Sequence, residues 1–158
     1  MSFSELASLS PVFRFPIGLL AAVGALLAMD RVMTRLPEGW TPPGVAAGVL
    51  TGTHPDDAPP RLAAVAHYLA GLGTGLLFIY LSLVGEWILG GSSAVSVAAT
   101  AAVLYVLMVG FFVVVPLPRA PGLDAARRVT VGRDWAIAAA AYVAVLVPTV
   151  VGVSLALL

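Results

Sequence analysis

Asp30 and His67 are the side chains in this sequence whose types and setting point most directly to chemistry. Each lies within a long apolar run, where an ionisable group is costly to bury and therefore marks a functional candidate. Histidine changes its charge near neutral pH, and a neighbouring carboxylate shifts that change, so an Asp–His pair could take up and release a proton. If the two runs form neighbouring antiparallel helices, the two residues lie at comparable depth. The sequence therefore predicts that they approach each other.

Further polar side chains could join this pair at the same end of the molecule, namely Tyr68, Arg133, Asp134 and Tyr142. Three interpretations of Asp30 and His67 stay open. The pair could tie helices together, it could form a protonation site, or its members could extend separately toward the membrane surface. The sequence favours the first.

Cofactor and metal chemistry find little support. A b-type haem in a membrane generally needs two axial histidines, and only His67 lies in an apolar run, so such a site would need two chains. His54, Asp56 and Asp57 offer ligand types that suit a metal ion, but a solvated acidic loop is the favoured interpretation. The chain has no cysteine, which excludes disulfides, thiolate zinc sites and iron–sulfur clusters. Because it also lacks a nucleophile–base arrangement, we expect no cofactor and no enzymatic activity.

Four long apolar runs account for most of the 158 residues. Hydrophobic residues make up 60% of the chain and charged residues 10%, whereas ordinary soluble domains are about 25% charged. Each run is close to the ~20 residues with which an α-helix crosses ~30 Å of hydrocarbon. We therefore expect one domain with an all-α fold, an integral membrane four-helix transmembrane bundle with helices at about 12–33, 62–84, 94–116 and 135–158.

The segments between the runs predict the topology. Within the long polar segment 36–61, Gly44–Leu50 could form a short helix along the interface. Seven arginines lie on the side of segments 36–61 and 117–134, and only Arg14 lies on the other. By the positive-inside rule, both segments are cytoplasmic and both termini lie outside a cell membrane. We expect Glu86, at the outer end of the second run, to face water.

Small residues predict how the helices pack. Gly71 and Gly75 are four residues apart, so they lie on one helix face and allow another backbone to approach closely. The first run offers a matching face of small residues: Gly18, Ala21, Ala22 and Ala25. Packing within one chain is the favoured interpretation, and a homo-oligomer is the alternative.

Three short segments taken together resemble a known group of proteins. They are Ala28-Met29-Asp30-Arg31, then Ala66-His67-Tyr68-Leu69-Ala70-Gly71 with Tyr80, and finally Arg127-Arg128-Val129. This pattern is similar to the small four-helix membrane proteins of the YagU-like kind, which are grouped as families of unknown function. Those families often have a histidine near the start of the last helix, where this chain has Gly132-Arg133-Asp134. The resemblance implies the four-helix fold and draws attention to Asp30, His67 and Gly71.

We expect a non-enzymatic small integral membrane protein that serves as an accessory or structural component of a membrane complex. Its partners would be the lipid bilayer and another membrane protein, and a net charge of zero gives no reason to expect nucleic acid. The alternative is a homo-oligomeric channel or carrier for a small solute or protons that uses Asp30 and His67. Closed polar pairs would favour the first function, and a water-accessible cavity that reaches either residue would favour the second.

Overall fold

Helices form nearly the whole of residues 11–157, which are the residues that the computed structural model of the chain describes. Four are long and apolar enough to cross a membrane: α1 (Pro11–Met33), α3 (Pro60–Leu89), α4 (Ala94–Val114) and α5 (Ala125–Ala156). The short helix α2 (Thr41–Thr51) and the 3-10 turns η2 (Pro55–Asp57) and η3 (Leu117–Arg119) lie between them. This confirms the prediction of an all-α bundle of four membrane helices.

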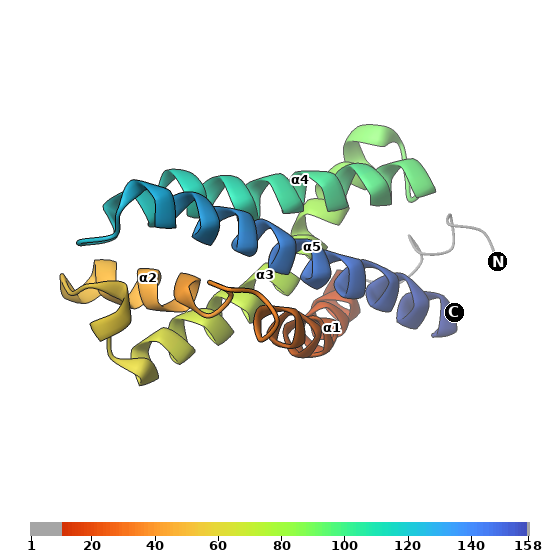
Figure 1. Ribbon diagram of the computed structural model, residues 1–158. Coiled ribbons are helices and arrows are strands. Elements are labelled where there is room, and N and C mark those ends of the chain that lie inside the picture. Colours follow the sequence, from red (N-terminus) through yellow and green to blue (C-terminus); the bar gives the residue numbers. More distant parts are fainter. Residues whose placement is uncertain (1–10, 158) are drawn as a thin grey trace.

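The four long helices form a ring. Along the ring, α1 packs on α3, α3 on α4, α4 on α5 and α5 again on α1. The turn at residues 90–93 joins α3 and α4 at one end, and the two helices diverge toward the other end (Figure 1). At that second end, α2 packs against both α3 and α5.

The interface between α1 and α3 is antiparallel and closely packed. Contacts recur every four residues along both helices, because residues four apart share one helix face. These contacts pair Asp30 with His67, Leu26 with Gly71, Ala22 with Gly75, and Gly18 with Ile79. Small residues of α1 and α3 therefore face each other within one chain.

The last membrane helix begins earlier than the sequence analysis predicted. Helix α5 starts at Ala125, ten residues before the predicted start near residue 135, and the predicted last residue, Leu158, lies outside the described part. The side chain of Asp124 caps the helix by accepting a 2.8 Å hydrogen bond from the Arg127 backbone N–H. A helix of this length measures about 48 Å, which exceeds the ~30 Å hydrocarbon core. Its arginine-rich first turns can therefore be helical without lying in lipid.

The short helix expected at Gly44–Leu50 exists and is slightly longer, spanning Thr41–Thr51. Pro42 and Pro43 occupy its first turn, where a missing N–H costs nothing. Gly52 ends it in the left-handed conformation, with φ 71°. One side of α2 is buried against the bundle, so it packs as part of the fold.

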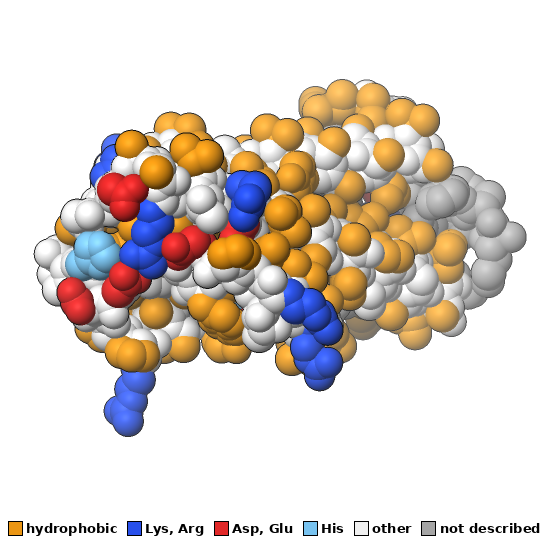
Figure 2. Space-filling view, in the orientation of Figure 1, with side chains coloured by type: hydrophobic (Ala, Val, Ile, Leu, Met, Phe, Trp, Pro, Cys, Tyr) orange, Lys and Arg blue, Asp and Glu red, His pale blue; other side chains and the backbone are white. Residues whose placement is uncertain are grey.

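Charge and hydrophobicity are segregated along the molecule. In Figure 2, charged side chains and a histidine gather mainly on the half of the visible face that holds α2, with a few basic side chains near the middle, while hydrophobic side chains predominate on the other half. An apolar surface of this kind suits contact with lipid tails.

Candidate functional site

Asp30, His67 and Tyr68 form a closed polar cluster between α1 and α3. His67 Nε2 lies 2.8 Å from Asp30 Oδ1, and Tyr68 Oη donates to Asp30 Oδ2 over 3.0 Å. An ionised carboxylate is an acceptor only, so it can receive both hydrogen bonds. The structure thus brings together the two residues that antiparallel helices were expected to place side by side.

The imidazole of His67 is almost fully enclosed, with only 3% of its side chain exposed. The Trp40 ring meets it edge-on with the ring centroids 5.8 Å apart, and the Tyr68 ring lies at 5.1 Å on a similar inclination. Trp40 immediately precedes α2, so α2 and its flank help to enclose the histidine.

The other residues expected in this cluster lie elsewhere. Tyr142 is fully buried and donates a 2.6 Å hydrogen bond to the backbone carbonyl of Gly71, which links α5 to α3 across the bundle. Arg133 donates to its neighbour Asp134 at 2.9 and 2.8 Å, and Asp134 also accepts the Glu38 backbone N–H at 2.8 Å. Inclusion of Arg133 and Asp134 in the cluster was therefore wrong, because α5 presents them to the segment before α2.

A second polar group, which we call the α2 anchor, consists of Glu38, Asp56 and Arg127. The Arg127 guanidinium bridges the two carboxylates, with Nε 2.7 Å from Glu38 Oε1 and Nη1 2.7 Å from Asp56 Oδ2. Glu38 precedes α2 and Asp56 follows it, so one arginine on α5 holds both ends of the helix. The hydrogen bonds from Arg127 keep the pKa of the Glu38 and Asp56 carboxyls below their ordinary values.

The His54–Asp57 segment takes part in this anchor rather than standing alone in solvent. His54 Nδ1 accepts the Asp56 backbone N–H at 3.2 Å, and Asp56 pairs with Arg127. Within the described part of the chain, no group of three or more His, Cys, Asp or Glu side chains could hold a metal ion.

A cavity of about 390 Å³ lies beside His67, at the end of the bundle where α3 and α4 diverge. Its volume is within the range of about 300–1,000 Å³ found for small-molecule sites. All four long helices and α2 contribute to its lining. Most of the walls are aliphatic or aromatic, and the lining side chains with polar atoms are His67, Thr74, Trp135 and Tyr142.

The mouth of the cavity lies between α3 and α4. Every lining residue that is exposed belongs to one of these helices: Ala70, Leu77, Leu107 and Phe111. The residues that α1, α2 and α5 contribute are buried or half-buried. Both helices of the mouth are long and apolar enough to span a membrane, so the cavity opens on the side of the bundle, between two candidate membrane helices.

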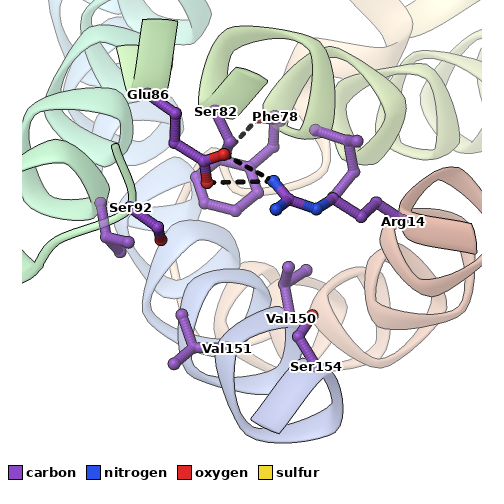
Figure 3. Close-up of a pocket in the computed structure, with 10 residues that line it drawn as sticks. Arg14, Phe78, Ser82, Glu86, Ser92, Val150, Val151 and Ser154 are labelled. Carbon is purple, nitrogen blue, oxygen red and sulfur yellow. Dashed lines mark hydrogen bonds and ion pairs between the residues drawn. The ribbon is translucent and has the colours of Figure 1, made fainter. Parts of the chain in front are cut away.

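Another ionic contact lies at the opposite end of the bundle. Arg14 of α1 and Glu86 of α3 form a salt bridge of 2.8 Å, with 8% and 16% of their side chains exposed. Figure 3 shows these two side chains meeting directly beside a small cavity of about 30 Å³, which Ser92 also lines. The expectation that Glu86 faces water was therefore wrong.

The sequence contained the signal for this second pair. Arg14 lies early in α1 and Glu86 late in α3, so antiparallel packing places the opposite charges at similar depth, as it does for Asp30 and His67. Burying an ion pair away from water is favourable only when its members meet with good geometry.

Comparison of the chain with protein-family models, with curated proteins and with solved structures gives no significant match. The similarity to the YagU-like proteins stays a prediction.

Proposed function

We propose that this protein is a non-enzymatic membrane protein that binds a small, largely apolar molecule of the bilayer in the cavity between α3 and α4. In this role it is an accessory component that holds such a molecule or passes it to a partner. The observation that carries the proposal is the apolar cavity of about 390 Å³ with its mouth between two membrane helices.

The composition of the cavity supports an apolar ligand. A site for a hydrated solute needs many polar groups to replace the lost water, because an unpaired polar group in an apolar setting is costly. Here the walls are built mainly from leucine, methionine, proline, alanine and phenylalanine side chains. A few polar groups at one end suit orientation of a ligand rather than its solvation.

The position of the mouth supports delivery from the membrane. A ligand dissolved in lipid reaches the cavity between Leu77 and Phe111 without crossing the charged end of the molecule. The α2 anchor, by contrast, ties α2 over the buried end of the cavity, to which Pro42, Pro43 and Ala46 contribute.

A channel or carrier for protons or small polar solutes receives less support. Such a path needs polar groups in series, whereas Asp30 is already engaged with both His67 and Tyr68. The arginine bias favours an orientation with 36–61 and 117–134 in the cytoplasm and both termini outside, so His67 would lie toward the cytoplasmic leaflet of the cell membrane.

Quenching of Trp135 fluorescence tests the proposal directly, because Trp135 lines the cavity. The chain has three tryptophans, so W40F and W87F together leave Trp135 as the only reporter. We expect 1-bromonaphthalene, an apolar quencher, to reduce Trp135 emission in a saturable manner in detergent micelles. A protein that retains only Trp87, which is 83% exposed, should show quenching that rises with micellar concentration without saturation.

A matched pair of substitutions on α3 provides the control. Ala70→Phe fills the mouth of the cavity and should abolish saturable quenching, while Ala64→Phe, at an exposed position that does not line the cavity, should leave it unchanged. Equal, non-saturable quenching in the Trp135-only protein and both variants would refute the proposal.

A further inference from the structure

The hydrogen-bond donors in the cavity lining are already used within the protein. The Thr74 hydroxyl donates to the Ala70 carbonyl at 2.8 Å, and the Tyr142 hydroxyl donates to the Gly71 carbonyl at 2.6 Å. The Trp135 indole N–H donates to the Met108 carbonyl at 3.1 Å. A ligand that needs to receive a hydrogen bond from these side chains would have to break one of these contacts.

His67 completes this pattern. Asp30 receives hydrogen bonds from both His67 Nε2 and the Tyr68 hydroxyl, which places the imidazole proton on Nε2. In a neutral imidazole the other nitrogen, Nδ1, is then an acceptor. Among residues 11–157 the structure gives Nδ1 no hydrogen-bond partner.

Nδ1 belongs to a nearly enclosed side chain that lines an apolar cavity. In a neutral ring, Nδ1 offers there a lone pair that a ligand can use. A polar atom without a partner in such a setting is costly, so a ligand that supplies a hydrogen-bond donor is favoured. The spare polar atoms of the lining side chains are therefore acceptors.

We propose that the ligand is a neutral hydrophobic hydroxyl compound, such as a phenol or an aromatic alcohol, whose O–H donates to His67 Nδ1 while its apolar body fills the cavity. This inference rests on the proposed function and adds the polarity of the ligand. Asp30 and Tyr68 act as positioning residues, because they fix the tautomer of the histidine without lining the cavity.

Two probes of nearly equal size test the inference. 2-Naphthol and 2-methylnaphthalene differ in one hydroxyl group, and each can be titrated as a competitor of 1-bromonaphthalene on the Trp135-only protein. We measure the ratio of their apparent affinities and compare it between variants, so that partition into the micelle cancels. His67→Phe should reduce the preference for naphthol about fivefold, which corresponds to one net hydrogen bond of about 1 kcal/mol.

Thr74→Val is the matched control, since it removes a different polar group of the lining, the Thr74 hydroxyl, and should leave the ratio unchanged. The inference would be overturned if the affinity ratio of naphthol to methylnaphthalene were the same in the parent protein and His67→Phe, or if only Thr74→Val lowered it. Binding of both probes would in that case still support the proposed function. If neither probe competed with 1-bromonaphthalene, both the proposed function and this inference would be refuted.

A measurement on the unmutated chain covers the case in which His67→Phe does not fold. The sequence has two histidines, so the ¹⁵N resonances of His67 can be assigned with His54→Gln. We expect the Nδ1 resonance to shift toward lower frequency when 2-naphthol is added and to stay in place with 2-methylnaphthalene. The inference would be contradicted if the Nδ1 chemical shift showed a protonated nitrogen in the absence of ligand, or if it did not change when naphthol was added.

Discussion

The Gly18 carbonyl oxygen faces the Cα of Gly75 so closely that a Cβ on Gly75 would lie 2.5 Å from it. The same Cβ would lie 2.6 Å from Ala22 Cβ. Lipid tails supply no hydrophobic force between membrane helices, so close backbone contacts of this kind carry much of the association. The contact between α1 and α3 also holds Asp30 next to His67, two helical turns farther along the same interface.

Replacing Gly75 by alanine should separate the two helices. Because the nearest atoms are the backbone of Gly18 and the Cβ of Ala22, which no side-chain rotation can move, we expect a loss of about 1–3 kcal/mol in the free energy of unfolding. Gly73→Ala is the matched control on the same helix, since its Cβ would meet no atom within 4 Å. Unfolding in mixed micelles measures both, and equal stabilities of the two variants would contradict the packing described here.

The α2 anchor should make the stability of the fold decrease at acidic pH. The pKa of Glu38 and of Asp56 is lowered in the folded protein, so each carboxylate contributes stability above its ordinary pKa and loses it as the pH falls through the lowered value. We expect Arg127→Gln to lower stability by about 1 kcal/mol at neutral pH. Its melting temperature should also fall less than that of the parent protein when the pH drops below about 4.

Arg61→Gln provides the comparison for this prediction. Arg61 is exposed, and the described residues give its side chain no hydrogen bond or salt bridge. This variant should keep the acid dependence of the parent protein. If Arg127→Gln and Arg61→Gln lost stability in parallel between neutral and acidic pH, the anchor would not hold α2.

The ion pair between Arg14 and Glu86 should be sensitive to removal of one partner. Glu86→Gln removes the negative charge beside a largely buried guanidinium but keeps an amide oxygen that accepts a hydrogen bond, and we expect a loss of about 1–3 kcal/mol in unfolding free energy. Replacing both residues by leucine should recover much of that loss, because apolar side chains avoid the desolvation of two charges. If the double leucine variant were as unstable as Glu86→Gln, loss of the ion pair would not be the cause of the lower stability.

The membrane helices could be predicted because long apolar runs report directly on contact with lipid. The start of α5 could not be predicted in this way, since residues 125–134 are helical yet contain Arg127, Arg128, Arg133 and Asp134. Hydropathy indicates which residues suit contact with lipid. The part of a helix that extends beyond the membrane is polar, so hydropathy does not identify it. The cap by Asp124 was the local signal for the earlier start.

The candidate site was predictable only in part. Antiparallel packing predicted the contact between Asp30 and His67, and the same argument applied to Arg14 and Glu86 would have predicted the second pair. The cavity depends on how far α3 and α4 diverge and on where α2 packs, which are properties of the assembled bundle. Small residues such as Ala66, Ala70 and Gly71 leave space beside His67, but the sequence does not specify whether another side chain fills it.

Native mass spectrometry of the protein, released in mild detergent from the membranes in which it is produced, tests the central claim most directly. We predict a bound small molecule that stays with the parent protein and with Ala64→Phe and is lost from Ala70→Phe, whose new ring occupies the mouth of the cavity. If the three proteins carried the same bound molecules, or if none carried any and none could be loaded with 2-naphthol, the cavity between α3 and α4 would not be a binding site.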